Sequence, residues 1–229
     1  MENTTIQSFV APLPSRATRK PPARSKASAR GLIPAKTKSD PHLRTRYTES
    51  TKEQDSFFIF LARHDVLDIW EQPTPITYRD GTGRRRRHVF DFRVTLTDGR
   101  KIAVAVKPYA LVDRHNFRHT LSLIRAATPP SIADEIVLVT ERSYTPSAAR
   151  NARKLHDFRR TPDDEADQMI ASMAATLTAP VTISTLVAAS GLGGRAFRAA
   201  FRAIYAGALR SLDVGDILPS THVVSGGTL

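Results

Sequence analysis

The chain has 229 residues, a formal net charge of +12 and a pI near 10.5, and it contains no cysteine. The lack of cysteine excludes disulfide staples and thiolate zinc sites. The longest uninterrupted apolar stretch, residues 57–62, is far too short to span a membrane. The positive charge predicts a polyanionic partner, with nucleic acid ahead of acidic lipid. Arginine supplies most of this charge and matches phosphate well, although a GC-rich genome produces the same bias.

Residues 1–46 are predicted to be a disordered basic arm. Counted through Tyr47, the segment carries ten Lys or Arg against two acidic residues, a net +8, with many prolines and few apolar groups. Such a composition does not offset the entropy of ordering. We expect an arm that neutralises DNA phosphates, with a merely solvated tail as the alternative. No apolar core marks the N-terminus, so a secretory signal is not expected.

Residues 47–160 alternate between helical and strand periodicity and predict an α/β domain. A strong hairpin turn, Asp98-Gly99, stands between two of its strands. The expected helices cover residues 49–69, 114–127 and 146–160. The expected strands cover residues 76–78, 89–97, 101–106 and 136–140.

Residues 161–229 change character and predict a small helical domain. Acidic residues load the first turn of a helix after Pro162, where the helix dipole favours them. Helices at 183–189 and 195–206 follow, joined by a glycine-rich turn, and segments 209–212 and 221–224 can form a hairpin. This order of elements is that of a winged helix. One face of its last helix carries Arg195, Arg198 and Arg202, a pattern suited to a DNA groove.

The two central strands carry the chemical argument. Even positions of the first strand form its apolar face: Phe90, Phe92, Val94 and Leu96. Alternation then puts Asp91 on the opposite face, and a hairpin brings it close to Lys107 of the returning strand. A carboxylate beside a lysine suits Mg²⁺-dependent (or Mn²⁺-dependent) phosphodiester hydrolysis, in which the lysine positions water or stabilises phosphate charge. From spacing alone, a half-exposed surface ion pair is the more ordinary interpretation.

A second acid is expected from the preceding helix. Glu53 lies one turn before Phe57, so the face that docks on the sheet directs its carboxylate inward.

Several segments resemble, in order, the motifs of the TnsA nuclease domain of bacterial heteromeric transposases. Residues 48–57 resemble its ES-x-x-E-R-x-F opening, and residues 69–78 its "EQP…I-x-Y" strand. Residues 89–94 stand where the family has "PDF-x-V", and residues 98–108 resemble "DG…VEVKP". The late strand and final helix are similar at 137–141 and 151–155. Each motif is common, but their shared order over residues 49–160 is specific.

The resemblance implies a restriction-endonuclease-like fold of the PD-(D/E)xK type, a mixed sheet flanked by helices. It implies that Glu53 is the helix acid, Asp91 the central metal ligand of Mg²⁺ or Mn²⁺, and Lys107 the catalytic lysine, without a small-molecule cofactor. The chain departs from the pattern where Phe90 replaces proline and where Ala105 replaces a carboxylate or amide ligand. A methyl group does not bind Mg²⁺, so a ligand is missing unless water or another acid substitutes.

The resemblance also implies a function. We expect an endonuclease that cuts double-stranded DNA at the ends of a mobile element, together with a DDE-type transposase and an ATPase regulator, in the bacterial cytoplasm at the nucleoid and away from membranes. One alternative is a degenerate relative that binds DNA or a transposase without cutting. Another is a winged-helix regulator on a nuclease-shaped platform.

Two basic clusters remain open to interpretation. A run before Asp91 is expected to grip DNA at the rim of the cleft, or to be a solvated loop; it consists of Arg84, Arg85, Arg86 and Arg87. The C-terminal helix with Arg195, Arg198 and Arg202 is expected to contact either DNA or a transposase, since the family's C-terminal domain mainly engages transposase partners.

Overall fold

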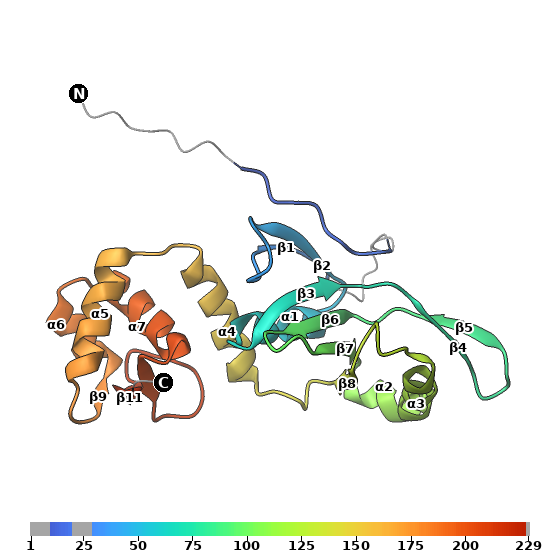
Figure 1. Cartoon of the computed structure of the whole chain (residues 1–229). Coiled ribbons are helices and arrows are strands. Elements are labelled where there is room, and N and C mark those ends of the chain that lie inside the picture. Colours follow the sequence, from blue (N-terminus) through green and yellow to red (C-terminus); the bar gives the residue numbers. More distant parts are fainter. Residues whose placement is uncertain (1–9, 20–28, 228–229) are drawn as a thin grey trace. The chain divides into compact units, whose positions relative to one another are not determined.

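The computed structural model describes residues 10–19 and 29–227, and these divide into two compact units (Figure 1). Unit 1 comprises the described residues through Phe57 and the segment His64–Arg142. Unit 2 comprises Phe58–Arg63 and the described residues from Ser143 onward. We expected the boundary at residue 160. The division instead groups the helix before that residue with the C-terminal unit.

The centre of unit 1 is a four-stranded mixed sheet in the order β3-β6-β7-β8. Its strands are β3 (Val66–Glu71), β6 (Phe92–Leu96), β7 (Lys101–Val106) and β8 (Glu135–Val139). Strands β3, β6 and β7 run antiparallel to their neighbours, and β8 pairs with β7 in parallel. The sheet confirms the predicted mixed α/β architecture, including the hairpin at Asp98-Gly99, where Gly99 takes a φ of 91°.

Helices cover both faces of this sheet. Helix α1 (Thr51–Ala62) packs on one face, where the Phe57 and Phe92 rings lie 6.2 Å apart. Helices α2 (Tyr109–Arg114) and α3 (Phe117–Ala127) follow β7, and Leu121 and Ile124 of α3 join an apolar cluster on the other face. The single helix expected at 114–127 is therefore two helices, because Asn116 adopts a left-handed conformation between them.

The expected helix at 49–69 is wrong beyond Ala62. The chain turns after α1 and enters β3, whose Ile69 and Glu71 pair with Val94 and Phe92 of β6. The spacing of the apolar residues fits a helix as well as a strand, and only the pairing with β6 decides between them.

Two hairpins extend unit 1. The first joins β1 (Gly31–Ala35) and β2 (Arg44–Thr48), and the second joins β4 (Ile76–Arg79) and β5 (Arg85–His88). Both are antiparallel.

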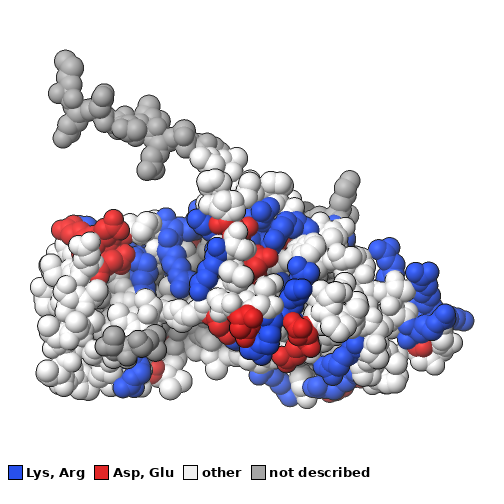
Figure 2. Space-filling view, in the orientation of Figure 1, with Lys and Arg blue, Asp and Glu red and all other residues white. Residues whose placement is uncertain are grey.

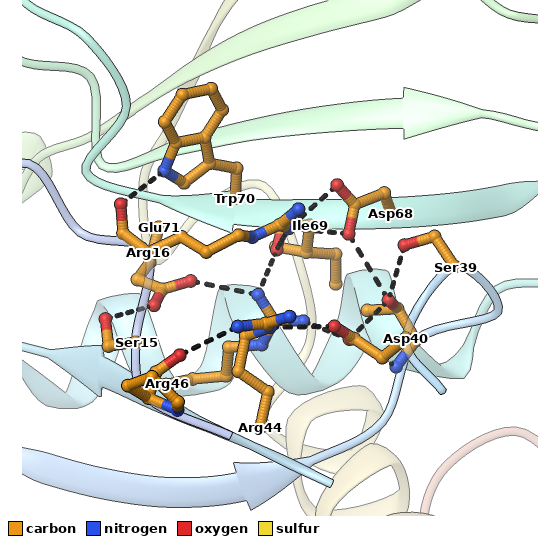
Figure 3. A network of polar contacts seen from close by, with 12 residues as sticks. Ser15, Arg16, Ser39, Asp40, Arg44, Arg46, Asp68, Ile69, Trp70 and Glu71 are labelled. Atoms are coloured by element: carbon orange, nitrogen blue, oxygen red, sulfur yellow. Dashed lines mark hydrogen bonds and ion pairs between the residues drawn. The ribbon is translucent and has the colours of Figure 1, made fainter. Parts of the chain in front are cut away.

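The predicted disordered arm is wrong for its described part. Residues 10–19 lie along β3, where the Thr18 amide donates to the Gln72 carbonyl over 3.0 Å. Residues 29–46 include β1 and most of β2. Ion pairs with β3 account for the ordering of both segments. Asp68 of β3 binds Arg16 of the first segment, and Glu71 of β3 binds Arg46 of the second (Figure 3). Residues 1–9 and 20–28 of the predicted arm lie outside the described residues.

Unit 2 begins with α4 (Pro146–Arg159), which Thr145 caps at its N-terminus. The next elements are α5 (Asp164–Thr176), β9 (Val181–Thr182), α6 (Ile183–Ser190), α7 (Gly194–Ala206), β10 (Leu209–Ser211) and β11 (His222–Ser225). The predicted hairpin β10–β11 is confirmed, and the short β9, which the sequence did not predict, pairs with β11. Phe201 is fully buried and meets the Phe158 ring edge-on at 5.2 Å.

Candidate active site

Asp91 lies immediately before β6, where three strands meet. Its amide donates to the Val104 carbonyl over 2.9 Å, and its carbonyl accepts from the Gln72 amide over 2.9 Å. The Asp91 carboxylate accepts a hydrogen bond of 2.6 Å from the Val106 amide. The backbone of β3 and β7 therefore fixes the position of this acid.

The predicted alternation along residues 89–97 holds only from Phe92 onward. All four even positions are buried as expected, but they do not share one face. Phe92 meets Phe57 of α1, whereas Phe90 belongs to the cluster with Ala103 and Ala105 under α3. The chain bends at Asp91, and the bend interrupts the two-residue period.

Glu53 of α1 is directed inward, as expected. It is buried, with Oε2 accepting from the Glu49 amide over 2.8 Å and Oε1 from the Ser50 hydroxyl over 2.9 Å. Since the Ser50 hydroxyl in turn accepts from the Glu53 amide, the pair forms a variant of the capping box at the helix start, in which the Glu53 carboxylate binds the Glu49 amide instead of the Ser50 amide. Burial, together with the negative charge of Asp91, raises the pKa of Glu53 to about 7.

Lys107 follows β7, and its amide donates to the Val139 carbonyl over 3.0 Å. Its Nζ lies 5.5 Å from the centre of the Phe117 ring. Burial raises the pKa of Asp91, and the nearby Lys107 charge and the Val106 amide oppose that rise. The charge of Asp91 thus interacts with those of Glu53 and Lys107, while the catalytic roles of all three stay predictions.

Gln72 is a neighbour of this site that the motif analysis did not single out. It is buried and left-handed, with a φ of 43°, a conformation that is strained for a residue with a side chain. Its Nε2 donates to Glu49 over 2.7 Å, and its Oε1 has no hydrogen-bond partner within the described residues. The only sequence signal was its place in the Glu-Gln-Pro motif.

Arg19 and His88 also border the site. Arg19 forms an ion pair of 2.5 Å with Glu49 and so ties residues 10–19 to the start of α1. His88 stacks edge-on against Phe90, with ring centres 4.8 Å apart. Burial lowers the pKa of His88 to about 4, and the charges of Lys107 and Arg19 act in the same direction.

The donor set fits a hard divalent cation but lacks a full set of protein ligands. Glu53 and Asp91 offer carboxylate oxygens, which suit Mg²⁺ or Mn²⁺, and a cation would relieve their mutual repulsion. Across the described part of the chain, however, no group of three His, Cys, Asp or Glu is placed to hold a metal ion. Ala105 itself is fully buried in the apolar cluster that also contains Phe90.

The two departures from the family pattern therefore share one cluster. Phe90 enlarges a side chain and Ala105 shortens one, and both pack with Ile124 and Ile136. Their combination preserves a close-packed interior under α3.

The arginine run at 84–87 is not a loop, as one alternative had it. Arg85, Arg86 and Arg87 form most of β5, and Arg84 precedes it. All four are exposed.

The expected basic face of α7 is largely neutralised. Arg195 forms bonds of 2.7 and 2.8 Å with Asp163 and also reaches Glu165, while Arg202 binds Asp167 over 2.7 Å. These acids cap and begin α5, so they hold α7 against α5. Arg198 has no ion pair or hydrogen bond among the residues described. Two of the three arginines predicted to bind DNA thus have a structural partner already.

The mixed sheet and its flanking helices form an α/β unit that is consistent with a nuclease-like fold. Residues 63–148 match the family model described as "TnsA-like endonuclease N terminal". The matched segment includes Asp91, Ala105 and Lys107, and the resemblance to a TnsA-like nuclease is confirmed. No curated protein matches the chain. None of the described helices is both long and apolar enough to cross a membrane.

Proposed function

We propose that this protein is a metal-dependent DNA endonuclease of the TnsA type, which cuts at the ends of a mobile element. The family match over residues 63–148 supports the proposal, together with the charge interactions of Asp91 with Glu53 on α1 and with Lys107 after β7. Asp91 and Glu53 would hold Mg²⁺ or Mn²⁺, with water completing the coordination. When bound, the cation supplies positive charge that polarises the scissile phosphate and acidifies water.

The chain's own residues prepare this chemistry. The Val106 amide holds the Asp91 carboxylate in place, and the capping box holds Glu53 at the start of α1. In this proposal, Lys107 stabilises the negative charge that develops on the phosphate. Its position over the Phe117 ring restricts the motion of a side chain that is otherwise flexible.

Unit 2 supports a role in assembly. The order α5, β9, α6, α7, β10, β11, with its three-stranded sheet, supports the proposal that this unit is a winged helix. Because Arg195 and Arg202 are paired within the unit, contact with a transposase is favoured over insertion of α7 into DNA. In this proposal a DDE-type transposase and an ATPase regulator are the protein partners, and the reaction takes place on DNA in the cytoplasm.

One observation favours a second function. A buried methyl group at the position of Ala105 removes a ligand that hydrolysis ordinarily uses, while Glu53 already serves the helix start. A catalytically degenerate accessory that binds DNA and a transposase would keep such a site without turnover.

Binding of Mn²⁺ alone separates the two functions. The endonuclease proposal expects Mn²⁺ binding by electron paramagnetic resonance, and Asp91→Asn should weaken it by more than about 100-fold, the upper end for loss of an outer-shell group. Asp98→Asn is the matched control, because Asp98 is an exposed acid at the far end of the same hairpin.

Nicking of supercoiled DNA in Mg²⁺ then tests turnover. The proposal expects nicking by the wild type and by Asp98→Asn, and none by Asp91→Asn or Lys107→Ala. Duplex binding without any Mn²⁺ binding or nicking would establish the accessory function instead.

A further inference from the structure

The β4–β5 hairpin, hereafter the ribbon, separates its side chains onto two unlike faces. The register pairs Ile76 with His88 and Tyr78 with Arg86, so these side chains share one face. Ile76 is buried, and Tyr78 packs against the same apolar cluster as α3. His88 meets the rings of Phe90 and Phe117. This face is the one by which the ribbon is anchored to unit 1.

The other face carries arginine and little else. Alternation places four exposed residues on it: Thr77, Arg79, Arg85 and Arg87. Arg79 stands directly opposite Arg85. Like charges in that position destabilise a strand pair. Figure 2 shows Lys and Arg side chains over the hairpin that Figure 1 labels β4 and β5.

The charge on this face is not compensated. Arg85 and Arg87 have no ion pair or hydrogen bond among the residues that the structure describes. Arg79 has only a 2.9 Å hydrogen bond from Nη1 to the Gly83 carbonyl. On the anchored face, by contrast, Arg86 forms a 2.8 Å ion pair with Asp80, an acid that also binds Thr82 and the Arg84 amide. The ribbon thus neutralises one face and leaves the other as a row of free guanidinium groups.

We propose that the ribbon inserts its Arg79–Arg85–Arg87 face into the major groove of duplex DNA that flanks the cleavage point. A two-stranded antiparallel ribbon has the width that this groove accepts, and arginine binds both phosphate and the O6 and N7 atoms of guanine. The location agrees with the inference, because β5 leads through Val89 and Phe90 directly to Asp91. Duplex held by the ribbon would place the neighbouring backbone near that acid. The inference rests on the proposed action on DNA and assigns its docking face.

Two double variants test the face directly, since they remove the same charge from the same run of four arginines. Arg85→Ala/Arg87→Ala alters the free face, and Arg84→Ala/Arg86→Ala alters the anchored side. Binding of the full chain to a 5′-labelled duplex is measured by anisotropy across a salt series in EDTA, so that cleavage plays no part. Loss of two phosphate or groove contacts should make the log–log salt slope shallower by about 1.8, from about 0.9 per contact. The control pair should change it by less than half as much.

The control is conservative. Removing Arg86 frees the Asp80 carboxylate, and that negative charge repels DNA and works against the expected difference. Equal slopes for the two pairs, or a larger effect from the control pair, would overturn the inference and leave the endonuclease proposal standing. A wild type that binds no duplex at all would overturn both.

Groove placement has its own readout. Dimethyl sulfate methylates guanine N7 in the major groove, so an inserted ribbon should protect guanines in the duplex, and Arg85→Ala/Arg87→Ala should remove that protection. Unprotected guanines under a wild type that binds with high affinity would show that the ribbon touches only the backbone. The unchanged fluorescence of Trp70, which is the single tryptophan, verifies that each variant is folded.

Discussion

The arginines of the N-terminal segments and those of the ribbon look alike in the sequence and differ completely in the fold. Arg46 is fully buried, and its guanidinium binds Asp40, Glu71 and the Ile69 carbonyl (Figure 3). Arg16 binds Asp68 and lies over the Trp70 ring at 5.8 Å. The ribbon's free face, by contrast, is exposed, and none of its arginines forms an ion pair within the described structure.

The difference is set by carboxylates that another element delivers. Asp68 and Glu71 of β3 stand more than twenty residues from the arginines they bind, and they turn a like-charged segment into a packed one. The ribbon has one such acid, Asp80, and it serves one arginine. A basic run therefore predicts a polyanion partner only where the fold brings no acid to it.

The largest effect is expected at Arg46. Arg46→Met leaves Asp40 and Glu71 buried without their partner and should lower the free energy of unfolding of unit 1 by about 3–5 kcal/mol. Arg85→Ala, on the ribbon, should stay within about 0.5 kcal/mol of the wild type. Urea unfolding followed by Trp70 fluorescence measures both. A cost at Arg46 as small as that at Arg85 would refute the comparison.

The next largest cost in stability is expected for a buried charge that has no partner at all. Ala105→Glu puts a carboxylate into the cluster of Phe90, Ile124 and Ile136 and should destabilise unit 1 by about 3 kcal/mol or more at pH 8, and by less at pH 5, where the acid takes up a proton. Ala105→Leu, an apolar overpacking control, should show no such pH dependence. If Mn²⁺ restores the stability of Ala105→Glu, position 105 reaches the metal, and the shortage of ligands is due to this residue alone.

The central hairpin and the inward position of Glu53 were predictable because local signals determine them. The Asp-Gly turn and a helical face with Glu53 one turn from Phe57 are short-range features that the structure bears out, whereas two-residue alternation holds only from Phe92 onward. The catalytic roles of Glu53, Asp91 and Lys107 stay predictions, which the metal-binding and nicking experiments test.

What the sequence could not predict depends on distant partners. Residues 66–71 fit a helix until β6 is there to pair with them, and the order of residues 10–19 depends on acids of β3. The left-handed Gln72, the bend at Asp91 and the pairing of Arg195 with Asp163 are consequences of tertiary packing. Periodicity and composition carry no information on such contacts.

At the base of the ribbon, the fold favours the uncharged form of the His88 side chain. Its pKa lies near 4 in the folded protein against an ordinary 6.5, so the folded state binds fewer protons than the unfolded state between these values. Stability is therefore complete above pH 6.5 and is lost as the pH falls towards 4, by about 2–3 kcal/mol. His88→Phe keeps the ring contacts and should flatten this part of the pH profile of Trp70 unfolding. His119→Gln, at an exposed histidine, is the control and should follow the wild type.

The smallest effects on stability are expected on α7, where an ion-paired arginine and an unpaired arginine lie on the same helix. Arg195 is ion-paired with Asp163 and Glu165 but remains partly exposed, so Arg195→Ala should cost less than about 1 kcal/mol. Hydrogen exchange of peptides from α5 and α7 in the full chain measures this cost, because Trp70 lies in the other unit.

Arg198, on the same helix, has no ion pair or hydrogen bond among the described residues, so Arg198→Ala should leave the stability of unit 2 unchanged. The pair also tests the binding mode of α7. If the helix reads DNA, Arg198→Ala should weaken duplex binding more than Arg195→Ala does, because only its guanidinium is free to meet phosphate without first breaking an ion pair. If unit 2 contacts a transposase instead, neither substitution should change the salt slope of duplex binding, while the ribbon pair Arg85→Ala/Arg87→Ala still does. We expect the second result, because the acids of α5 already occupy two of the three arginines on this face.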